Sequence, residues 1–455
     1  MSWTGRHAER RTPLLPADGP LRRTRRRDPA QMTRRAWTLL GLHVLLPGSA
    51  QMVAGTRAVG RVALTVALAL WALVLVVILV WVVQPDILVG VLTSATGLTV
   101  VQVGLLVLAV GWLALTLDTL RLARVLRTKP VARPVLASAL VLLSVLGAGG
   151  AAWGAYLSGV ARGAIVSVFP AAEAEHAAQS LGRYNILLAG IDRVNGAHAL
   201  QPESLSVVSV DARTGAATMI GLPVQLREVP FVATSPMHRL YPKGYGSTGC
   251  IAKPCALENV YSEAQAIGVT LYPDAKAEHT SPGMQAVREA VEGVLGITVQ
   301  YAVQVDTGSF GELVDALGGA TIDVPQRSVE TGGAPVAFPA GEQHMNGARA
   351  VQYIRGEASA NDYGQVARTQ QVEAAMLRQA NPANVLLQFR TIASAGSGAV
   401  QTDLPQDLLT DLTVLALKTR GQQARQVELV PPLVANPLKP DDAAIRRVVA
   451  AATRS

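Results

Sequence analysis

The sequence predicts an all-α transmembrane region followed by an α/β domain with three layers, α/β/α, around a mixed central sheet. Of 455 residues, 50% are hydrophobic and 16% are charged, so a membrane portion has to be considered before a soluble core. Residues 1–160 carry 17 Lys and Arg against 5 Asp and Glu, whereas the remainder carries 23 against 27. Beyond residue 181, strand and helix patterns alternate, which is typical of a helix-covered sheet.

Residues 1–35 form a basic segment that we expect to be a disordered cytoplasmic tail. The run Arg22-Arg23-Thr24-Arg25-Arg26-Arg27 lies among Pro, Thr and Gly without an apolar pattern. Such a tail is typical of a topology determinant that lies against anionic lipid, and a regulatory or partner-binding tail is the alternative.

The predicted transmembrane region covers residues 36–157. Leu46-Pro47-Gly48-Ser49 interrupts the apolar stretch 37–54, so neither part is long enough to cross a bilayer of about 30 Å, and we expect an interfacial or re-entrant hairpin there. Three uninterrupted apolar stretches follow, each near the roughly 20 residues that a spanning helix needs. These predicted spans are residues 62–83, 98–120 and 135–157.

Loop charges predict how the spans are oriented. The loop between the first two spans holds only the acidic Asp86, whereas the loop between the second and third is basic through Arg121, Arg124, Arg127, Lys129 and Arg133. The basic loop and the N-terminus are therefore expected in the cytoplasm, with a stalk (158–180) and the domain 181–455 outside. No cleavable signal peptide is expected, because no small-residue cleavage site follows a short apolar core. The predicted product is a multi-pass cell-membrane protein embedded in the lipid bilayer.

The charge distribution also excludes a class of partner. The high pI belongs to the N-terminal part, so the folded domain lacks the basic patch that nucleic-acid binding needs, and no nucleic-acid partner is expected.

Cys250 and Cys255 have no second Cys pair or His nearby, which favours a small disulfide in an exported domain over a zinc site.

Within the outer domain, residue patterns place the regular elements. Period-two or short apolar runs predict strands, and apolar spacing of three and four predicts helices. The expected strands are 184–193, 205–210, 217–221, 301–305 and 320–324, and the expected helices are 284–295, 309–317, 366–379, 405–417 and 441–451.

Two polar clusters mark a candidate site. The first expected strand ends in Gly190-Ile191-Asp192-Arg193, and ligand sites of open α/β sheets lie at such strand ends. This stretch alone is more typical of a turn. A second cluster far downstream, from Tyr353 and Arg355 to Asp362 and Arg368, makes a site the better interpretation.

These segments resemble the LytR-CpsA-Psr (LCP) family of cell-envelope proteins. The resemblance runs in family order over residues 184–380, and its most specific piece is Leu313-Val314-Asp315-Ala316-Leu317-Gly318-Gly319. The other matching pieces are Asn185 to Asp192, Ser204 to Asp211, Asn259-Val260-Tyr261, Ala340 to Gly347, and Tyr353-x-Arg355 with Asp362-Tyr363 and Arg368.

The resemblance implies a phosphotransferase that moves a glycopolymer from a polyprenyl diphosphate carrier onto peptidoglycan, with Mg²⁺ or another divalent cation. Arginines would take up the negative charge that develops on the diphosphate, and carboxylates would hold the metal. Asp362, Arg355 and Arg368 are the expected catalytic residues, and the two arginines together with Arg193 are the expected phosphate ligands. We expect the metal between Asp192 and Glu203, with two solvated loop acids as the alternative. The helix from Met284 to Leu295 is either a wall of the apolar slot for the lipid or ordinary core.

The sequence also departs from the family pattern. Four arginines expected near the phosphates are replaced, within Gln201-Pro202-Glu203, within Pro223-Val224-Gln225, at Glu357 and at Gln365. Two hypotheses follow: an enzyme with fewer phosphate ligands, which the surviving carboxylates favour, or a catalytically degenerate LCP protein that binds envelope lipid intermediates or acts as a scaffold or regulator. A transcription regulator is disfavoured, because no helix-turn-helix is evident.

Overall fold

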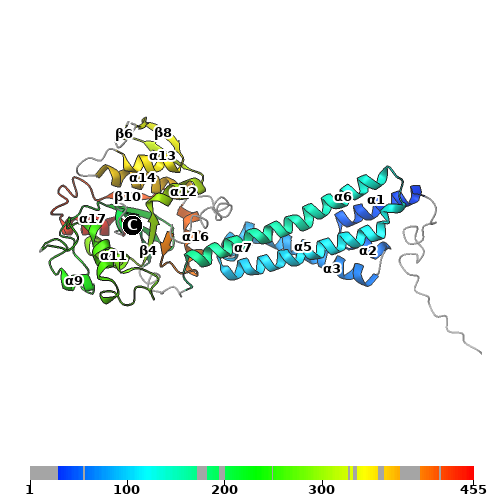
Figure 1. Ribbon diagram of the computed structural model, residues 1–455, viewed down its shortest axis with the longest axis horizontal. Helices are drawn as coiled ribbons and strands as arrows, with labels where there is room; N and C mark the ends of the chain where they lie inside the picture. Colours follow the sequence, from blue (N-terminus) through cyan, green and yellow to red (C-terminus); the bar gives the residue numbers. More distant parts are fainter. Residues whose placement is uncertain are drawn as a thin grey trace, which may run out of the picture. The chain divides into compact units, whose positions relative to one another are not determined.

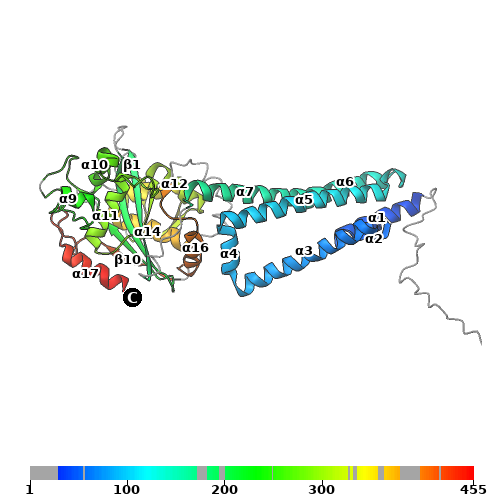
Figure 2. The same cartoon turned by 90° about the horizontal axis from the view of Figure 1, so that it is seen from below.

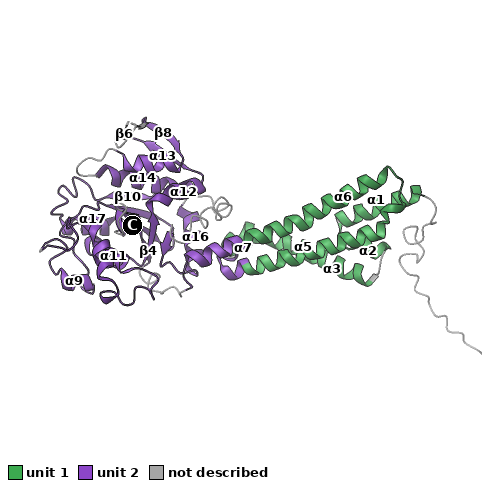
Figure 3. Cartoon of the chain, in the orientation of Figure 1, with its two compact units in different colours: residues 1–88, 99–158 green, residues 89–98, 159–455 purple. Residues whose placement is uncertain are grey.

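A computed structural model describes residues 29–54, 57–171, 182–193, 200–247, 249–325, 328–330, 336–356, 363–379, 400–419 and 422–454. The chain divides into two compact units, residues 1–88 with 99–158 and residues 89–98 with 159–455 (Figure 3).

The first unit is helical. Three helices are long and apolar enough to cross a membrane: Ala58–Val83, Ala95–Arg127 and Ala132–Val168. The elements in this part of the chain are α1 (Pro29–Leu45), α2 (Ser49–Ala54), α3 (Arg57–Val83), α4 (Pro85–Thr93), α5 (Ala95–Ala123), α6 (Ala132–Ser144) and α7 (Gly150–Val168). The interruption predicted near Pro47 separates α1 from α2, and Gly48 takes φ +98° there, beside the backbone of Leu64.

Two boundaries differ from the sequence-based expectation. Helix α1 begins at Pro29, so residues 29–35 are helical and only residues 1–28 of the expected tail lie outside the described residues. Proline is favoured in the first turn of a helix, and Met32 and Ala36 are buried, which gives this segment a packed face. Helix α7 runs on to Val168, so the first part of the expected stalk is helical, and Ala161, Ala164 and Ile165 give this part a buried face.

The second unit is built on a mixed six-stranded sheet with the order β10-β3-β2-β1-β4-β9. Its central strand β1 (Arg183–Arg193) pairs antiparallel with β2 (Leu200–Asp211) and parallel with β4 (Tyr301–Asp306). The hairpin partner β3 (Ala217–Leu222) follows β2, and β10 (Arg425–Glu428) and β9 (Val400–Thr402) form the edges. Two small sheets pair β5 (Ala320–Val324) with β8 (Gly341–Met345), and β6 (Ser328–Glu330) with β7 (Val336–Phe338).

Helices cover both faces of this sheet, which completes the predicted three layers (Figures 1 and 2). One face carries α10 (Leu257–Ile267), α11 (Pro282–Leu295) and α17 (Asp442–Thr453), and packs through a large apolar core that includes Leu187, Leu205 and Val207. The other carries α12 (Thr307–Ala316), α13 (Gly347–Arg355) and α14 (Tyr363–Gln379). The other α-helices among the described residues of this unit are α9 (Pro236–Leu240) and α16 (Leu408–Thr419).

A hydrogen-bonded loop beside α10 contains both cysteines. Cys250 and Cys255 are joined in a disulfide. The buried Glu263 of α10 accepts hydrogen bonds from the Tyr245 hydroxyl at 2.8 Å and from the amides of Ile251 and Ala252 at 3.0 and 2.9 Å. The loop is thus fastened to the core both covalently and through one carboxylate.

Candidate functional site

Two carboxylates meet where β1 and β2 pair at their polar end. Asp192 faces Gln201 in the antiparallel ladder, and the register shifts between Gly190 and Ile191. This irregularity brings Glu203, two residues further along β2, beside Asp192. The two side chains are similarly accessible, at 34% and 35% exposed, so both are open to a ligand.

Arg355 lies between these carboxylates. Its Nη2 donates to Asp192 Oδ2 at 3.2 Å and to Glu203 Oε2 at 3.3 Å. Arg355 is the last residue of α13, a helix whose N-cap Asn346 accepts a hydrogen bond from the Arg349 amide. A basic residue in the last turn also suits the helix dipole. All three residues were predicted from the sequence as site residues, Arg355 as a phosphate ligand; its contact with the two carboxylates was not predicted.

The charge balance at this cluster is acidic, with two carboxylates around one guanidinium. Burial raises the pKa of Glu203, Arg355 lowers it in part, and the neighbouring Asp192 raises it again. Two negative charges against one positive charge favour the binding of a further cation. No group of three or more His, Cys, Asp or Glu side chains in the described part of the chain is placed to hold a metal. A cation here would therefore rest on Asp192 and Glu203, which is enough for Mg²⁺, because that ion binds through one or two carboxylates and keeps several waters.

The other expected site residues are placed differently. The Nε of Arg368 donates to the carbonyl oxygen of Ile354 at 3.1 Å, so Arg368 holds the end of α13 and is not among the residues that line the neighbouring pocket. Arg193 is the last residue of β1, and its side chain is outside what the structure describes. Asp362 lies outside the described residues, so its expected catalytic role stays a prediction.

An apolar pocket opens beside the Arg355 cluster. Its volume is about 340 Å³, and it lies between the sheet and helices α12, α13 and α14. Residues of β1, β2, β3 and β4 form its floor, and helical side chains form its roof, while Glu203 and Arg355 lie at its edge. Representative apolar lining residues are Leu188, Val208, Val303, Phe310, Leu313 and Met376.

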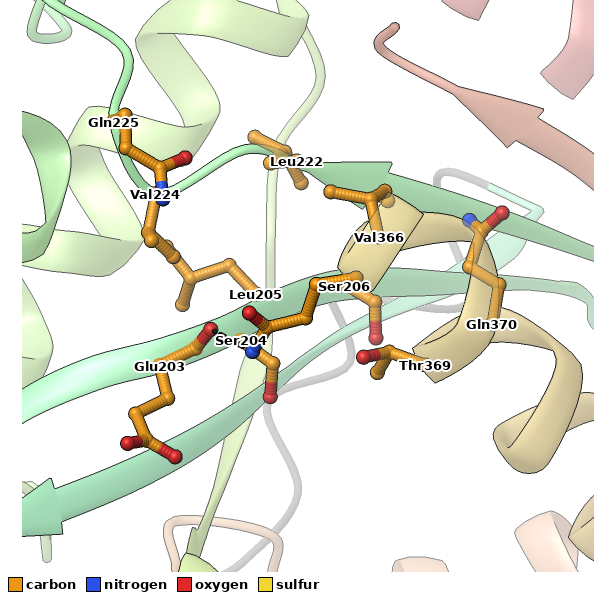
Figure 4. A pocket seen from close by; sticks show the side chains of 12 residues that line it. Glu203, Ser204, Leu205, Ser206, Leu222, Val224, Gln225, Val366, Thr369 and Gln370 are labelled. Carbon is orange, nitrogen blue, oxygen red and sulfur yellow. Dashed lines mark hydrogen bonds between the residues drawn. The ribbon is translucent and has the colours of Figure 1, made fainter. Parts of the chain in front are cut away.

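A much smaller recess adjoins the pocket, between β2, the end of β3 and the start of α14 (Figure 4). It has a volume of about 20 Å³, which is room for roughly one water. Thr369 Oγ1 and Gln370 Oε1 line it from α14, and neither has a hydrogen-bond partner among the described protein atoms. Val224 and Gln365 also line this recess, so a valine and an amide occupy positions where the family resemblance implies arginines.

Helix α11 is part of the core. Met284, Val287, Val291 and Leu295 are all at most 4% exposed and belong to the core on the opposite face of the sheet. The interpretation of this helix as ordinary core is confirmed, and the apolar pocket is lined instead by α12, α13 and α14. In the sequence, Thr369, Glu373 and Met376 recur at helical spacing along one side of α14, but this wall of the pocket was not predicted from them.

The fold and site define a class of protein: a three-layer domain whose mixed sheet carries, on one face, an apolar pocket with charged residues at its edge. The chain belongs to the LytR_cpsA_psr family, whose model matches residues 168–431.

The curated relatives are similar to limited parts of this chain. A polyisoprenyl-teichoic acid–peptidoglycan teichoic acid transferase TagU of Halalkalibacterium halodurans is 24% identical over 232 residues, which are 50% of this chain and 64% of the relative. The TagV transferase of Bacillus subtilis is 28% identical over 28% of this chain and 34% of the relative. A probable cell wall biosynthesis protein LcpB of Corynebacterium glutamicum is 29% identical over a segment that covers 32% of this chain and 36% of the relative. The chain thus spans between about a third and just under two thirds of these relatives.

Solved structures similar to this chain include Bacillus subtilis TagV, with a TM-score of 0.43, 21% identity, and coverage of 60% of this chain and 97% of that one. A LytR-Csp2A-Psr enzyme from Actinomyces oris has a TM-score of 0.41 and 17% identity, with coverage of 60% and 90%.

Proposed function

We propose that this protein is a membrane-anchored phosphotransferase that attaches polyprenyl-diphosphate-linked glycopolymers to peptidoglycan during cell-wall assembly. The observation that supports this most is the apolar pocket of about 340 Å³, which has Glu203 and Arg355 at its edge and Asp192 paired with that arginine. A polyprenyl diphosphate consists of an apolar chain joined to a charged head, which matches an apolar pocket with charged residues at its edge. The names of the curated relatives, polyisoprenyl-teichoic acid–peptidoglycan transferases, agree with this substrate class.

The proposed reaction is one phosphoryl transfer. A peptidoglycan hydroxyl oxygen bonds to the phosphorus that carries the glycopolymer, and the bond from that phosphorus to the bridging oxygen breaks. Polyprenyl phosphate leaves with the electron pair, and a carboxylate accepts the hydroxyl proton. Arg355 would stabilise the negative charge on the phosphate oxygens by charge-assisted hydrogen bonds, once it exchanges its carboxylate partners for the substrate.

A divalent cation, Mg²⁺ in our proposal, would bind at Asp192 and Glu203. Both carboxylates are within reach of a single guanidinium nitrogen, at 3.2 and 3.3 Å, so they converge on one position. Once bound, the cation would supply positive charge next to the diphosphate. It would also free Arg355 for the phosphate.

Replacing Asp192 by asparagine tests this site. The change keeps the size of the side chain but removes one of the two charged oxygen ligands, so we expect Mg²⁺-dependent transfer to fall by at least about a hundredfold and the Mg²⁺ concentration for half activity to rise. Asp323→Asn, on an exposed strand position outside the pocket, is the matched control. Unchanged metal dependence in Asp192→Asn would remove the metal assignment.

The three apolar helices support a membrane location for this activity. We propose that the N-terminus and the loop from Arg121 to Arg133 are cytoplasmic and that the domain after α7 is outside the cell, because the basic residues of the short loops cluster on one side. The domain, its lipid-linked substrate and the peptidoglycan acceptor would then all be on the outer side of the bilayer. A fusion after Ser158 to a reporter that is active only in the cytoplasm should therefore be inactive.

The second candidate is a non-catalytic family member that binds lipid-linked intermediates, acts as a scaffold or regulates envelope assembly. It is favoured by Val224 and Gln365, which line the recess at positions where the family resemblance implies arginine. The variant Gln365→Arg distinguishes the two candidate functions. In the wild type, the Gln365 side chain lies in the recess and its Nε2 donates to the Glu203 carbonyl oxygen at 3.1 Å, so an arginine at this position would start from the recess. For an enzyme with fewer phosphate ligands, we expect this arginine to raise polyprenyl diphosphate affinity by about tenfold or more. Absence of polyprenyl diphosphate binding in both the wild type and Gln365→Arg would contradict the enzyme and the lipid-binding protein alike, and would leave a scaffold or regulator.

A further inference from the structure

Glu373 is a titratable group inside the apolar pocket that the proposed reaction does not use. It projects from the middle of α14 into the pocket, between Thr369 and Met376 at helical spacing. The Ser206 hydroxyl on β2 lies 3.0 and 2.8 Å from the two carboxylate oxygens. A hydroxyl has one proton to donate, so at most one of these contacts is a full hydrogen bond at a time.

The surroundings of Glu373 disfavour its charged form. Burial raises its pKa to about 7, and the bond from Ser206 opposes this only in part. No charged group contributes to this shift. Several described elements that pack against α14 carry charged residues, but only Glu203 and Arg355 among these residues line the pocket, and both lie at its edge. The charged residues that do not line it are Asp211 on β2, Asp323 on β5, Arg349 on α13, Asp411 and Lys418 on α16, Arg425 and Glu428 on β10, and Arg368 and Arg378 on α14 itself.

A pocket of about 340 Å³ holds several waters, and these waters can solvate a carboxylate. An apolar chain that fills the pocket replaces them with groups that make no hydrogen bonds. A carboxylate left in such surroundings costs several kcal/mol, whereas a neutral carboxyl group that shares hydrogen bonds with Ser206 costs far less. The filled pocket therefore favours the protonated side chain.

We propose that the pocket takes up an apolar chain together with one proton, which neutralises Glu373. This inference rests on the proposed function, because it assumes that a polyprenyl-like chain enters the pocket. The step breaks no covalent bond in the ligand: a solvent proton adds to Glu373 as water leaves. Glu373 is a specificity-determining residue in this account, and it selects for apolar ligands only when it is neutral.

Proton linkage fixes the expected pH dependence. Below the pKa of the empty pocket, Glu373 is already neutral and affinity should not depend on pH. Above it, each bound chain must bring one proton, so the dissociation constant should rise about tenfold for each pH unit. The affinity is thus greatest on the acidic side of about pH 7.

The test uses the full chain in lipid nanodiscs and a neutral polyisoprenol that carries an uncharged fluorophore. A neutral head keeps the titration of Glu203 and the charge of Arg355 from dominating the result. We expect the dissociation constant of the wild type to rise about tenfold per unit above about pH 7 and that of Glu373→Gln to be independent of pH. Glu342→Gln, at an exposed strand position, is the control and should behave as the wild type.

Infrared difference spectra give a second readout that does not depend on affinity. Addition of the polyisoprenol at about pH 8 should produce the carbonyl band of a protonated carboxyl group in the wild type, and no such band in Glu373→Gln. Binding that is independent of pH in the wild type, with no new band, would overturn this inference alone. Absence of polyisoprenol binding in both proteins at every pH would overturn the proposed function and this inference with it.

Discussion

Replacing Arg355 by alanine is expected to abolish glycopolymer transfer. Arg355 is the only arginine among the described residues that line the pocket, and it would carry the charge-assisted hydrogen bonds to the diphosphate. Such bonds contribute about 1.5–3 kcal/mol each, so the loss of two corresponds to a fall in kcat/KM of at least about a hundredfold. Arg355 also lowers the pKa of Glu203, so its removal should raise that pKa further. Steady-state transfer rates as a function of pH measure both effects.

Arg378→Ala is the matched control for this experiment. Arg378 is exposed in the last turn of α14, on a neighbouring helix, and does not line the pocket. Its replacement should leave the transfer rate within about twofold of the wild type. If Arg355→Ala retains comparable activity, Arg355 does not bind the phosphate and the assignment is wrong.

Filling the pocket should have the second largest effect. Val351 lines the pocket from α13, and a tryptophan there would occupy part of the volume of about 340 Å³. Each methylene of the polyprenyl chain that can no longer be buried costs about 0.8 kcal/mol, so exclusion of three or four lowers affinity by about a hundredfold. Binding of polyprenyl diphosphate to the Val351→Trp variant, measured by fluorescence titration in nanodiscs, checks this.

The control for this variant makes the same change on an exposed surface. Val269 is 69% exposed and lies outside the pocket, so Val269→Trp should bind as the wild type does. Circular dichroism melting curves establish that both variants are folded. Equal polyprenyl diphosphate affinity in Val351→Trp and Val269→Trp would show that the chain does not use this pocket.

The long, regular elements of the outer domain could be predicted from the sequence. The hairpin of β2 and β3 and the strand β4 follow from short apolar runs, and α11 follows from apolar spacing after a Ser-Pro start; its N-cap Ser281 accepts a hydrogen bond from the Met284 amide. Elements with weaker patterns were not predicted. The edge strand β10 is only four residues long, and α13 is a nine-residue helix whose large apolar residues are Val351, Tyr353 and Ile354, so neither contains an apolar run long enough to predict it.

The candidate site was partly predictable for a related reason. Asp192 and Glu203 flank strand ends that are neighbours in sequence, and an antiparallel pair brings such ends together. The position of Arg355 between them depends on how α13 packs over the sheet, and local sequence does not contain that information. Glu373 was missed because a glutamate in a helix is usually solvated, and only the packing of α14 turns this one toward the pocket.

Transfer is measured most directly with the purified full chain in nanodiscs, a polyprenyl-diphosphate-linked glycan, peptidoglycan and Mg²⁺. We expect glycan to become covalently attached to peptidoglycan and polyprenyl phosphate to be released in equal amount. We expect Arg355→Ala to do neither, and chelation of Mg²⁺ to stop the wild-type reaction. Tight binding of the lipid-linked glycan by the wild type without attachment or release, at any Mg²⁺ concentration, would contradict the enzyme and leave the lipid-binding envelope protein.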